Sequence, residues 1–162
     1  MAKSKAKILV VDDNSGIRAA LKLLLPMHFA QVELIPSPNE LVSRIAEFRP
    51  DVVLLDMNFH TDINTGNEGL YWLSEIKKRC PDIEVVLFTA YADIQLAVEG
   101  MKRGAFDFIV KPWDNEKLIE TLKAAYNGRS KEARERNSVP PSSVSMLWGK
   151  GNYCYADDNT IN

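Results

Sequence analysis

The stretch "ILVVDDN" at residues 8–14 places two aspartates directly after an apolar run. A continuous apolar run of this length is typical of a strand in a parallel sheet that is covered on both faces. Carboxylates at the end of such a strand lose solvation, and the charges of adjacent residues repel each other. Asp12 and Asp13 therefore predict a positively charged group between them.

Four more apolar runs follow, so that five in all alternate with longer amphipathic stretches, at residues 8–11, 32–35, 52–55, 85–88 and 106–110. The first, third and fourth runs are continuously apolar, whereas the second contains Glu33 and the fifth contains Asp107. The two runs with a charge suit the edges of a sheet. The alternation predicts an α/β fold, a doubly wound five-stranded parallel sheet in the order 2-1-3-4-5 with right-handed crossovers.

Apolar residues at helical spacing lie between the predicted strands and define five helix faces. These faces comprise Ile17, Leu21 and Leu24; Leu41, Ile45 and Phe48; Leu70, Leu73, Ile76 and Cys80; Ile94, Ala97, Val98 and Met101; and Leu118, Leu122 and Ala125. Residues 37–40, Ser-Pro-Asn-Glu, have the spacing of a capping box at the start of the second helix. Gly104 is expected to end the fourth helix. Gly100 costs that helix about 1 kcal/mol relative to alanine, so we interpret it as a helix that moves.

Composition limits the class of protein. The formal net charge of the 162 residues is −2, so we expect no direct binding to nucleic acid. No apolar run approaches the roughly 20 residues of a membrane span, and no signal peptide is visible. Cys80 and Cys154 lie far apart without a Cys-x-x-Cys motif, which argues against a zinc site and favours a reducing compartment. We therefore expect a cytoplasmic protein that does not interact with membranes.

The periodic pattern covers only part of the chain. We interpret residues 1–6 as a basic N-terminal end. We expect Lys3, Lys5 and the adjacent Lys7 to be solvated. Residues 7–128 are the predicted domain. Residues 129–162 read as a linker and an irregular tail, because the segment is first charged and then rich in proline and serine.

The predicted strand order brings polar residues to one edge of the sheet. The first and third strands lie side by side at the centre, where their carboxyl ends open a crevice. Asp12 and Asp13 follow the first strand, and Asp56 follows the third. Three carboxylates predict a hard divalent cation, most simply Mg²⁺. Thr89 and Lys111, at the ends of the fourth and fifth strands, add a hydroxyl and an ammonium that suit a phosphoryl group.

Each residue also has a purely structural interpretation, because an aspartate after a strand often caps a helix and a Lys-Pro pair often forms a turn. The combination at four strand ends favours a functional site. Residues 6–127 resemble the receiver domain of two-component response regulators. Residues 104–113, "GAFDFIVKPW", resemble receivers of the NtrC class.

The resemblance implies a flavodoxin/CheY-like fold and a phosphorylation-activated switch. It implies that Asp56 accepts a phosphoryl group from the phosphohistidine of a sensor histidine kinase. It further implies that Mg²⁺ is held by Asp12, Asp13, Asp56 and the backbone carbonyl of Asn58. Thr89 and Lys111 would contact the phosphoryl oxygens, and Thr89 and Phe108 would form the switch pair. The Lys111–Pro112 peptide bond is expected to be cis.

We expect the signal to leave the site through a phosphorylation-dependent contact. We expect self-catalysed phosphotransfer and autodephosphorylation only, not an enzyme acting on an outside substrate. The output, transcription in this class, is expected to pass through the face formed by the fourth helix, fifth strand and fifth helix, residues 93–127, which we expect to form a phosphorylation-dependent homodimer. The chain has no G-x-x-x-x-G-K-[ST] motif, and its tail is too short for a helix-turn-helix domain.

Two other functions remain open from the sequence. One is a free-standing phosphorelay carrier. The other is a metal-dependent phosphatase with an aspartyl-phosphate intermediate, of the haloacid dehalogenase type, although that family needs a second acid where this chain has Asn58. Residues 57–69 form a segment about five residues longer than in typical receivers, and its role is open. His60 and Asp62 within it are possible additional metal ligands, but solvated loop residues are the simpler interpretation.

Overall fold

The computed structural model describes residues 3–57 and 68–128. Five strands and five α-helices alternate, with three short 3₁₀ turns between them. The strands are β1 (Ser4–Val11), β2 (Phe29–Ile35), β3 (Val52–Asp56), β4 (Glu84–Ala90) and β5 (Asp107–Lys111). The helices are α1 (Ser15–Leu24), α2 (Leu41–Phe48), α3 (Glu68–Arg79), α4 (Ile94–Lys102) and α5 (Asn115–Asn127). The 3₁₀ turns are η1 (Leu25–Met27), η2 (Pro38–Glu40) and η3 (Tyr91–Asp93).

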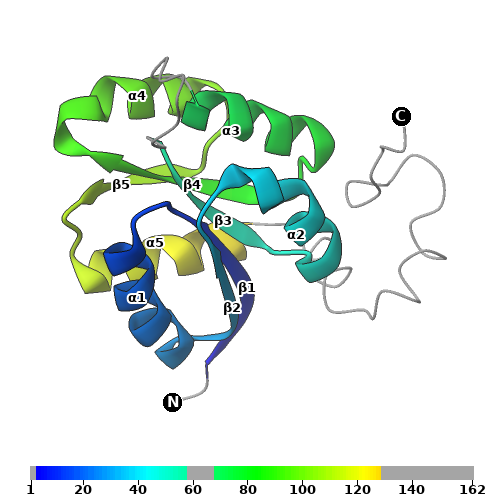
Figure 1. The fold of residues 1–162 in the computed structure, drawn as a ribbon, viewed down its shortest axis with the longest axis vertical. Helices are drawn as coiled ribbons and strands as arrows, with labels where there is room; N and C mark the ends of the chain where they lie inside the picture. Colours follow the sequence, from blue (N-terminus) through cyan, green and yellow to red (C-terminus); the bar gives the residue numbers. More distant parts are fainter. Residues whose placement is uncertain (1–2, 58–67, 129–162) are drawn as a thin grey trace, which may run out of the picture.

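All neighbouring strands are parallel, and the order β2-β1-β3-β4-β5 confirms the predicted topology. Helices α1 and α5 cover one face of the sheet, and α2, α3 and α4 cover the other (Figure 1). Successive residues of a central strand therefore enter two different cores. In β1, Leu9 and Val11 pack toward α2 and α3, whereas Ile8 and Val10 pack toward α1 and α5. This alternation explains why the central strands are apolar throughout.

The N-terminal end differs from the sequence interpretation. Strand β1 already begins at Ser4, whose amide donates to the carbonyl of His28 at 2.9 Å. Lys3 and Lys5 are exposed, but Lys7 is half-buried and donates from Nζ to the Phe48 carbonyl at 3.2 Å. Burial, together with the nearby Arg49 charge, lowers the pKa of Lys7. The interpretation of Lys7 as a solvated residue is therefore wrong.

Helix α4 is rotated relative to the predicted face. Ala97 is buried as expected, but the second buried residue is Gly100, while Val98 and Met101 are 41% and 38% exposed. A Cβ added at Gly100 would lie 2.3 Å from Cδ1 of Leu87 in β4. Glycine thus allows the helix to approach the sheet closely, and the interpretation of α4 as a helix that moves stays a prediction.

Two predicted helix boundaries have different outcomes. Gly104 follows α4 with a φ of 108°, a conformation that favours glycine, so it ends the helix as predicted. Ser37 accepts a hydrogen bond from the amide of Asn39, but the segment that it caps is η2. The predicted cap at Ser37 is therefore present, but the first turn that it caps is the 3₁₀ turn η2, which leads directly into α2 at Leu41.

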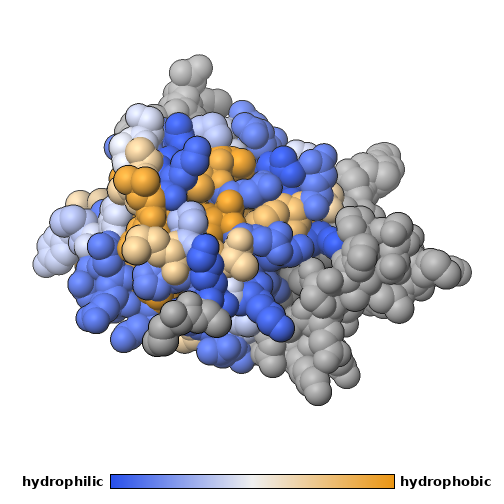
Figure 2. Space-filling view, turned by 90° about the horizontal axis from the view of Figure 1, so that it is seen from below, coloured by the Kyte–Doolittle hydropathy of each residue, from blue (hydrophilic) through white to orange (hydrophobic). Residues whose placement is uncertain are grey.

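The surface beside α1 is partly apolar. Leu23 in α1 and Met27 in η1 are 77% and 69% exposed. Figure 2 views the molecule from below Figure 1, from the side where α1 lies, and shows apolar residues gathered across the middle of this face with hydrophilic residues around them. Within the described ranges, no helix is long and apolar enough to cross a membrane.

Candidate functional site

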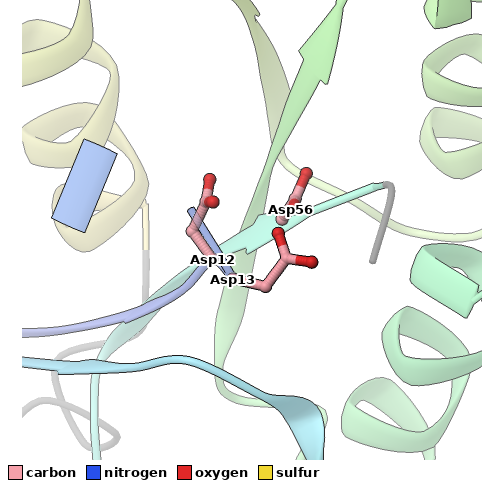
Figure 3. A group of neighbouring side chains, drawn as sticks. All are labelled: Asp12, Asp13 and Asp56. Carbon is pink, nitrogen blue, oxygen red and sulfur yellow. The ribbon is translucent and has the colours of Figure 1, made fainter. Parts of the chain in front are cut away.

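Three carboxylates meet where β1 and β3 end. The two strands are paired in register up to Val11 and Leu55, so that Asp12 and Asp13 follow β1 beside Asp56, the last residue of β3. One carboxylate oxygen from each of the three aspartates lies within 4.8 Å of the others (Figure 3). Asp12 is fully buried, Asp56 is 2% exposed and Asp13 is half-buried. The predicted convergence of these residues is present in the fold.

Lys111 places a positive charge beside two of the three carboxylates. Its Nζ lies 2.9 Å from Oδ2 of Asp12 and 3.1 Å from Oδ1 of Asp56. Burial of the ammonium disfavours its charge, but the carboxylates of Asp56 and Asp12 outweigh this effect and raise the pKa of Lys111. The ammonium therefore remains protonated at neutral pH.

The donor set fits a divalent cation. When ionised, three carboxylates and one ammonium leave a local charge of −3 + 1 = −2 in a largely buried site. Among the described residues, Asp12 Oδ2 accepts no hydrogen bond of acceptable geometry, although Lys111 lies beside it. Carboxylate oxygens are the ligands that Mg²⁺ prefers, and Mg²⁺ usually keeps several waters besides one or two carboxylates. The residues present therefore suit Mg²⁺.

The helix-capping role belongs to Asn14 instead of the aspartates. The Asn14 side chain accepts from the amide of Ile17 at 2.9 Å and caps α1. The Asn14 amide in turn donates to Oδ1 of Asp12 at 2.9 Å, and Arg18 donates to the Asp12 carbonyl at 2.9 Å. The sequence interpretation overlooked Asn14 and Arg18. The spacing from Asn14 to Ile17 is a capping signal that could have indicated Asn14.

Thr89 and Phe108 lie on the side of the site toward α4. Thr89 is fully buried, and its Oγ1 lies 3.3 Å from the carbonyl oxygen of Ala90 and 3.4 Å from that of Asp93. The hydroxyl thus contacts the backbone that leads into α4. Phe108 is half-buried and packs against the core between the sheet and α2, α3 and α4.

The Lys111–Pro112 peptide bond is cis, as the resemblance implied. Asn58, His60 and Asp62 lie outside the described residues, as do most of the long segment 57–69 and the tail 129–162. One further side chain that the sequence interpretation overlooked is Phe88, whose ring centroid lies 4.8 Å from Nζ of Lys111.

Comparisons with known proteins agree with the geometry. The family model described as response regulator receiver domain matches residues 8–123. The DNA-binding transcriptional regulator NtrC of Salmonella typhimurium is 32% identical over 130 residues, covering 80% of this chain and 27% of that protein. The transcriptional regulatory protein ZraR of the same species is 32% identical over 149 residues, covering 92% of this chain and 32% of that protein. The chain thus spans less than a third of the length of these curated relatives.

Solved structures show the same similarity. The N-terminal signal receiver domain of a two-component system response regulator from Bacteroides fragilis is 56% identical, with a TM-score of 0.69. The match covers 76% of this chain and 98% of that domain. The receiver domain of NtrX from Brucella abortus is 31% identical, with a TM-score of 0.67, and the match covers 75% of this chain and 99% of that domain.

Proposed function

This chain belongs to the response regulator receiver domain family, and we propose that it is a phosphorylation switch in which Asp56 accepts a phosphoryl group from the phosphohistidine of a sensor histidine kinase. One observation carries the proposal. Asp56 lies at the end of a central strand, with an acidic pair on one side and the Lys111 ammonium 3.1 Å from its Oδ1. Within the described part of the chain, no other group of three or more His, Cys, Asp or Glu side chains lies close enough together to hold a metal ion.

The transfer requires a nucleophile and charge neutralisation. Asp56 forms an O–P bond in line with the N–P bond that breaks, and the leaving imidazole keeps the electron pair of that bond and takes up a proton. Asp12, Asp13 and Asp56 would hold Mg²⁺, which supplies positive charge to the phosphoryl oxygens. Lys111 transfers its ammonium contact from the Asp56 carboxylate to a phosphoryl oxygen and so neutralises the remaining charge.

Thr89 connects the site to the output face. If its hydroxyl turns toward a phosphoryl oxygen, it gives up the carbonyl of Asp93, which immediately precedes α4. Phe108 then moves further into the space that Thr89 leaves. The predicted switch pair thus links phosphorylation to α4 and β5, within residues 93–127.

This face carries apolar side chains that suit a protein contact. Val98 and Met101 on α4 are 41% and 38% exposed, and Tyr91, just before α4, is 78% exposed. We propose a phosphorylation-dependent homodimer through α4, β5 and α5. The relatives named as transcriptional regulators support transcription as the output of a longer protein.

The experiment that tests the proposal measures phosphoryl uptake from acetyl phosphate with Mg²⁺. We expect one equivalent of acid-stable, base-labile phosphate per chain, formed faster than it is lost. Release of many equivalents of inorganic phosphate per chain would instead indicate the phosphatase alternative. A chain that passes its phosphoryl group to a histidine phosphotransferase protein, without any change in its own association, would indicate a phosphorelay carrier.

A further inference from the structure

Lys111 reaches the aspartates by crossing a neighbouring strand. It stands on the edge strand β5, whereas Asp56 is on β3, and β4 lies between these two strands. Lys111 pairs with Ala90 of β4, and Phe88, two residues earlier, pairs with Asp56. Because side chains two residues apart on a strand share a face, Phe88 lies on the face that Lys111 must cross.

The ring of Phe88 lies against the ammonium along this path. Nζ of Lys111 is 4.8 Å from the ring centroid, within the range of a cation–π contact. Phe88 is fully buried, and the Lys111 side chain is only 19% exposed. A desolvated cation–π contact is stronger than one at the surface.

The orientation of the Phe88 ring is itself constrained. Trp113 packs against it with ring centroids 5.3 Å apart and an interplanar angle of 57°. The indole Nε1 of Trp113 donates to Oδ1 of Asn115 at 2.8 Å, which ties the pair to the first residue of α5. The remaining surroundings of Phe88 belong to the core beneath α1 and α5.

We propose that Phe88 is a positioning residue that holds the Lys111 ammonium over the aspartate cluster through the face of its ring. The inference rests on the proposed function, because Lys111 serves there as the contact to the phosphoryl oxygens. Lysine has a long flexible side chain, so fixing its end in advance lowers the entropy lost in the transition state. The ring attracts the ammonium whether or not a metal ion occupies the carboxylates. It therefore keeps Lys111 in place when its contact shifts from Asp56 to the phosphoryl group.

Fluorination of the ring tests this role with little change in shape. In the full chain, Phe88 is replaced by phenylalanine with one, two or three ring fluorines, which progressively remove electron density from the ring face. The initial rate of phosphorylation by acetyl phosphate with Mg²⁺ is then measured. We expect a stepwise fall that reaches about tenfold for the trifluoro form. The same series at Phe29, a fully buried phenylalanine at the start of β2, should leave the rate unchanged.

A second measurement is independent of phosphorylation. In metal-free protein, the side-chain protons at the end of Lys111 should show an upfield ring-current shift by NMR, and Phe88→Leu should abolish it. Absence of that shift in the wild type would overturn the inference, as would a phosphorylation rate that fluorine does not change. Wild-type protein that takes up no phosphoryl group at all would overturn the proposed function and this role together.

Discussion

At the residue scale, the site combines three carboxylates with one ammonium in a largely buried environment. Asp12 and Asp56 are almost completely buried, and the ammonium of Lys111 contacts both. Asp12 also accepts a hydrogen bond from the amide of Asn14, which caps α1, so Asp12 has a structural role besides its proposed role as a metal ligand. Asp13 is half-buried, so we expect the removal of its charge to affect the fold less than the removal of the Asp12 charge.

Replacing Asp13 with asparagine should separate metal binding from stability. In chelator, Asp13→Asn should melt at or above the wild-type temperature, because repulsion among the carboxylates is reduced. Free Mg²⁺ at about 100 times its Kd should stabilise the wild type by about 2.7 kcal/mol, and the variant much less. Thermal melts with chelator and with Mg²⁺ provide the measurement. Strong destabilisation of the variant in chelator would mean that Asp13 is mainly structural.

Replacing Lys111 with methionine should lower the free energy of unfolding. Near neutral pH, the size of this loss should not depend on pH. The loss in chelator should be about 1–3 kcal/mol, because two buried carboxylates lose a charged partner. The pKa of Lys111 is raised above its ordinary value of 10.5, so its stabilising contribution is fully present below 10.5 and is lost as pH rises through the higher, folded-state pKa.

The measurement is urea unfolding of both proteins at about pH 7 and about pH 9, where the difference between them should be the same. A difference that shrinks markedly between these pH values would show that the ammonium titrates below its ordinary pKa, contrary to the contacts with Asp12 and Asp56.

At the element scale, α4 shows what a periodic pattern can and cannot predict. The residues expected on its buried face included Val98 and Met101, both of which the structure exposes. The orientation of α4 depends on how closely the helix can approach the sheet. Because Gly100 has no side chain, α4 can approach Leu87 closely when this glycine faces the sheet. A contact between residues on different elements leaves no trace in the spacing of apolar residues along one of them.

Alanine at position 100 should therefore destabilise the protein despite its better helix propensity. The added Cβ would lie 2.3 Å from Leu87 Cδ1, so the buried leucine or the helix must shift. We expect a loss of about 1–3 kcal/mol by urea unfolding. Combining Gly100→Ala with Leu87→Val, which removes the clashing methyl group, should cost less than the sum of the single changes. Stabilisation by Gly100→Ala alone would show that the close approach is not needed and would support the interpretation that Gly100 weakens a mobile helix.

At the scale of the whole molecule, the site follows largely from topology. Alternating apolar runs and two charged edge runs were enough to predict the strand order, and that order predicted that Asp12, Asp13 and Asp56 meet. The approach of Lys111 was predicted from the same edge of the sheet. The contact between Lys111 and Phe88 was not predicted, because it depends on the face of the sheet along which the Lys111 side chain crosses β4. Thr89 was correctly predicted to lie at the end of its strand. Its contact with the carbonyl of Asp93 could not be predicted, because that contact depends on the orientation of the Thr89 side chain.

Phosphorylation should change the output face in a concerted way. Coupling energies between sites are typically about 1–3 kcal/mol, so a beryllium fluoride mimic with Mg²⁺ should shift an existing equilibrium. We expect altered amide exchange across residues 90–112 and a higher association state in sedimentation. A control variant, Val98→Lys, should keep the exchange change near the site but lose association. Unchanged exchange in residues 90–112, or association through another face, would contradict this mechanism.

The most direct test of the central claim identifies the phosphorylated residue. The protein is treated with acetyl phosphate and Mg²⁺, the acyl phosphate is reduced with borohydride, and peptides are mapped by mass spectrometry. We predict a single modified residue, Asp56, in the wild type and in Asp107→Asn, a control that changes a half-buried aspartate on β5. Asp56→Asn should show no modification. Modification of a different residue in the wild type, or wild-type uptake by Asp56→Asn, would contradict the account.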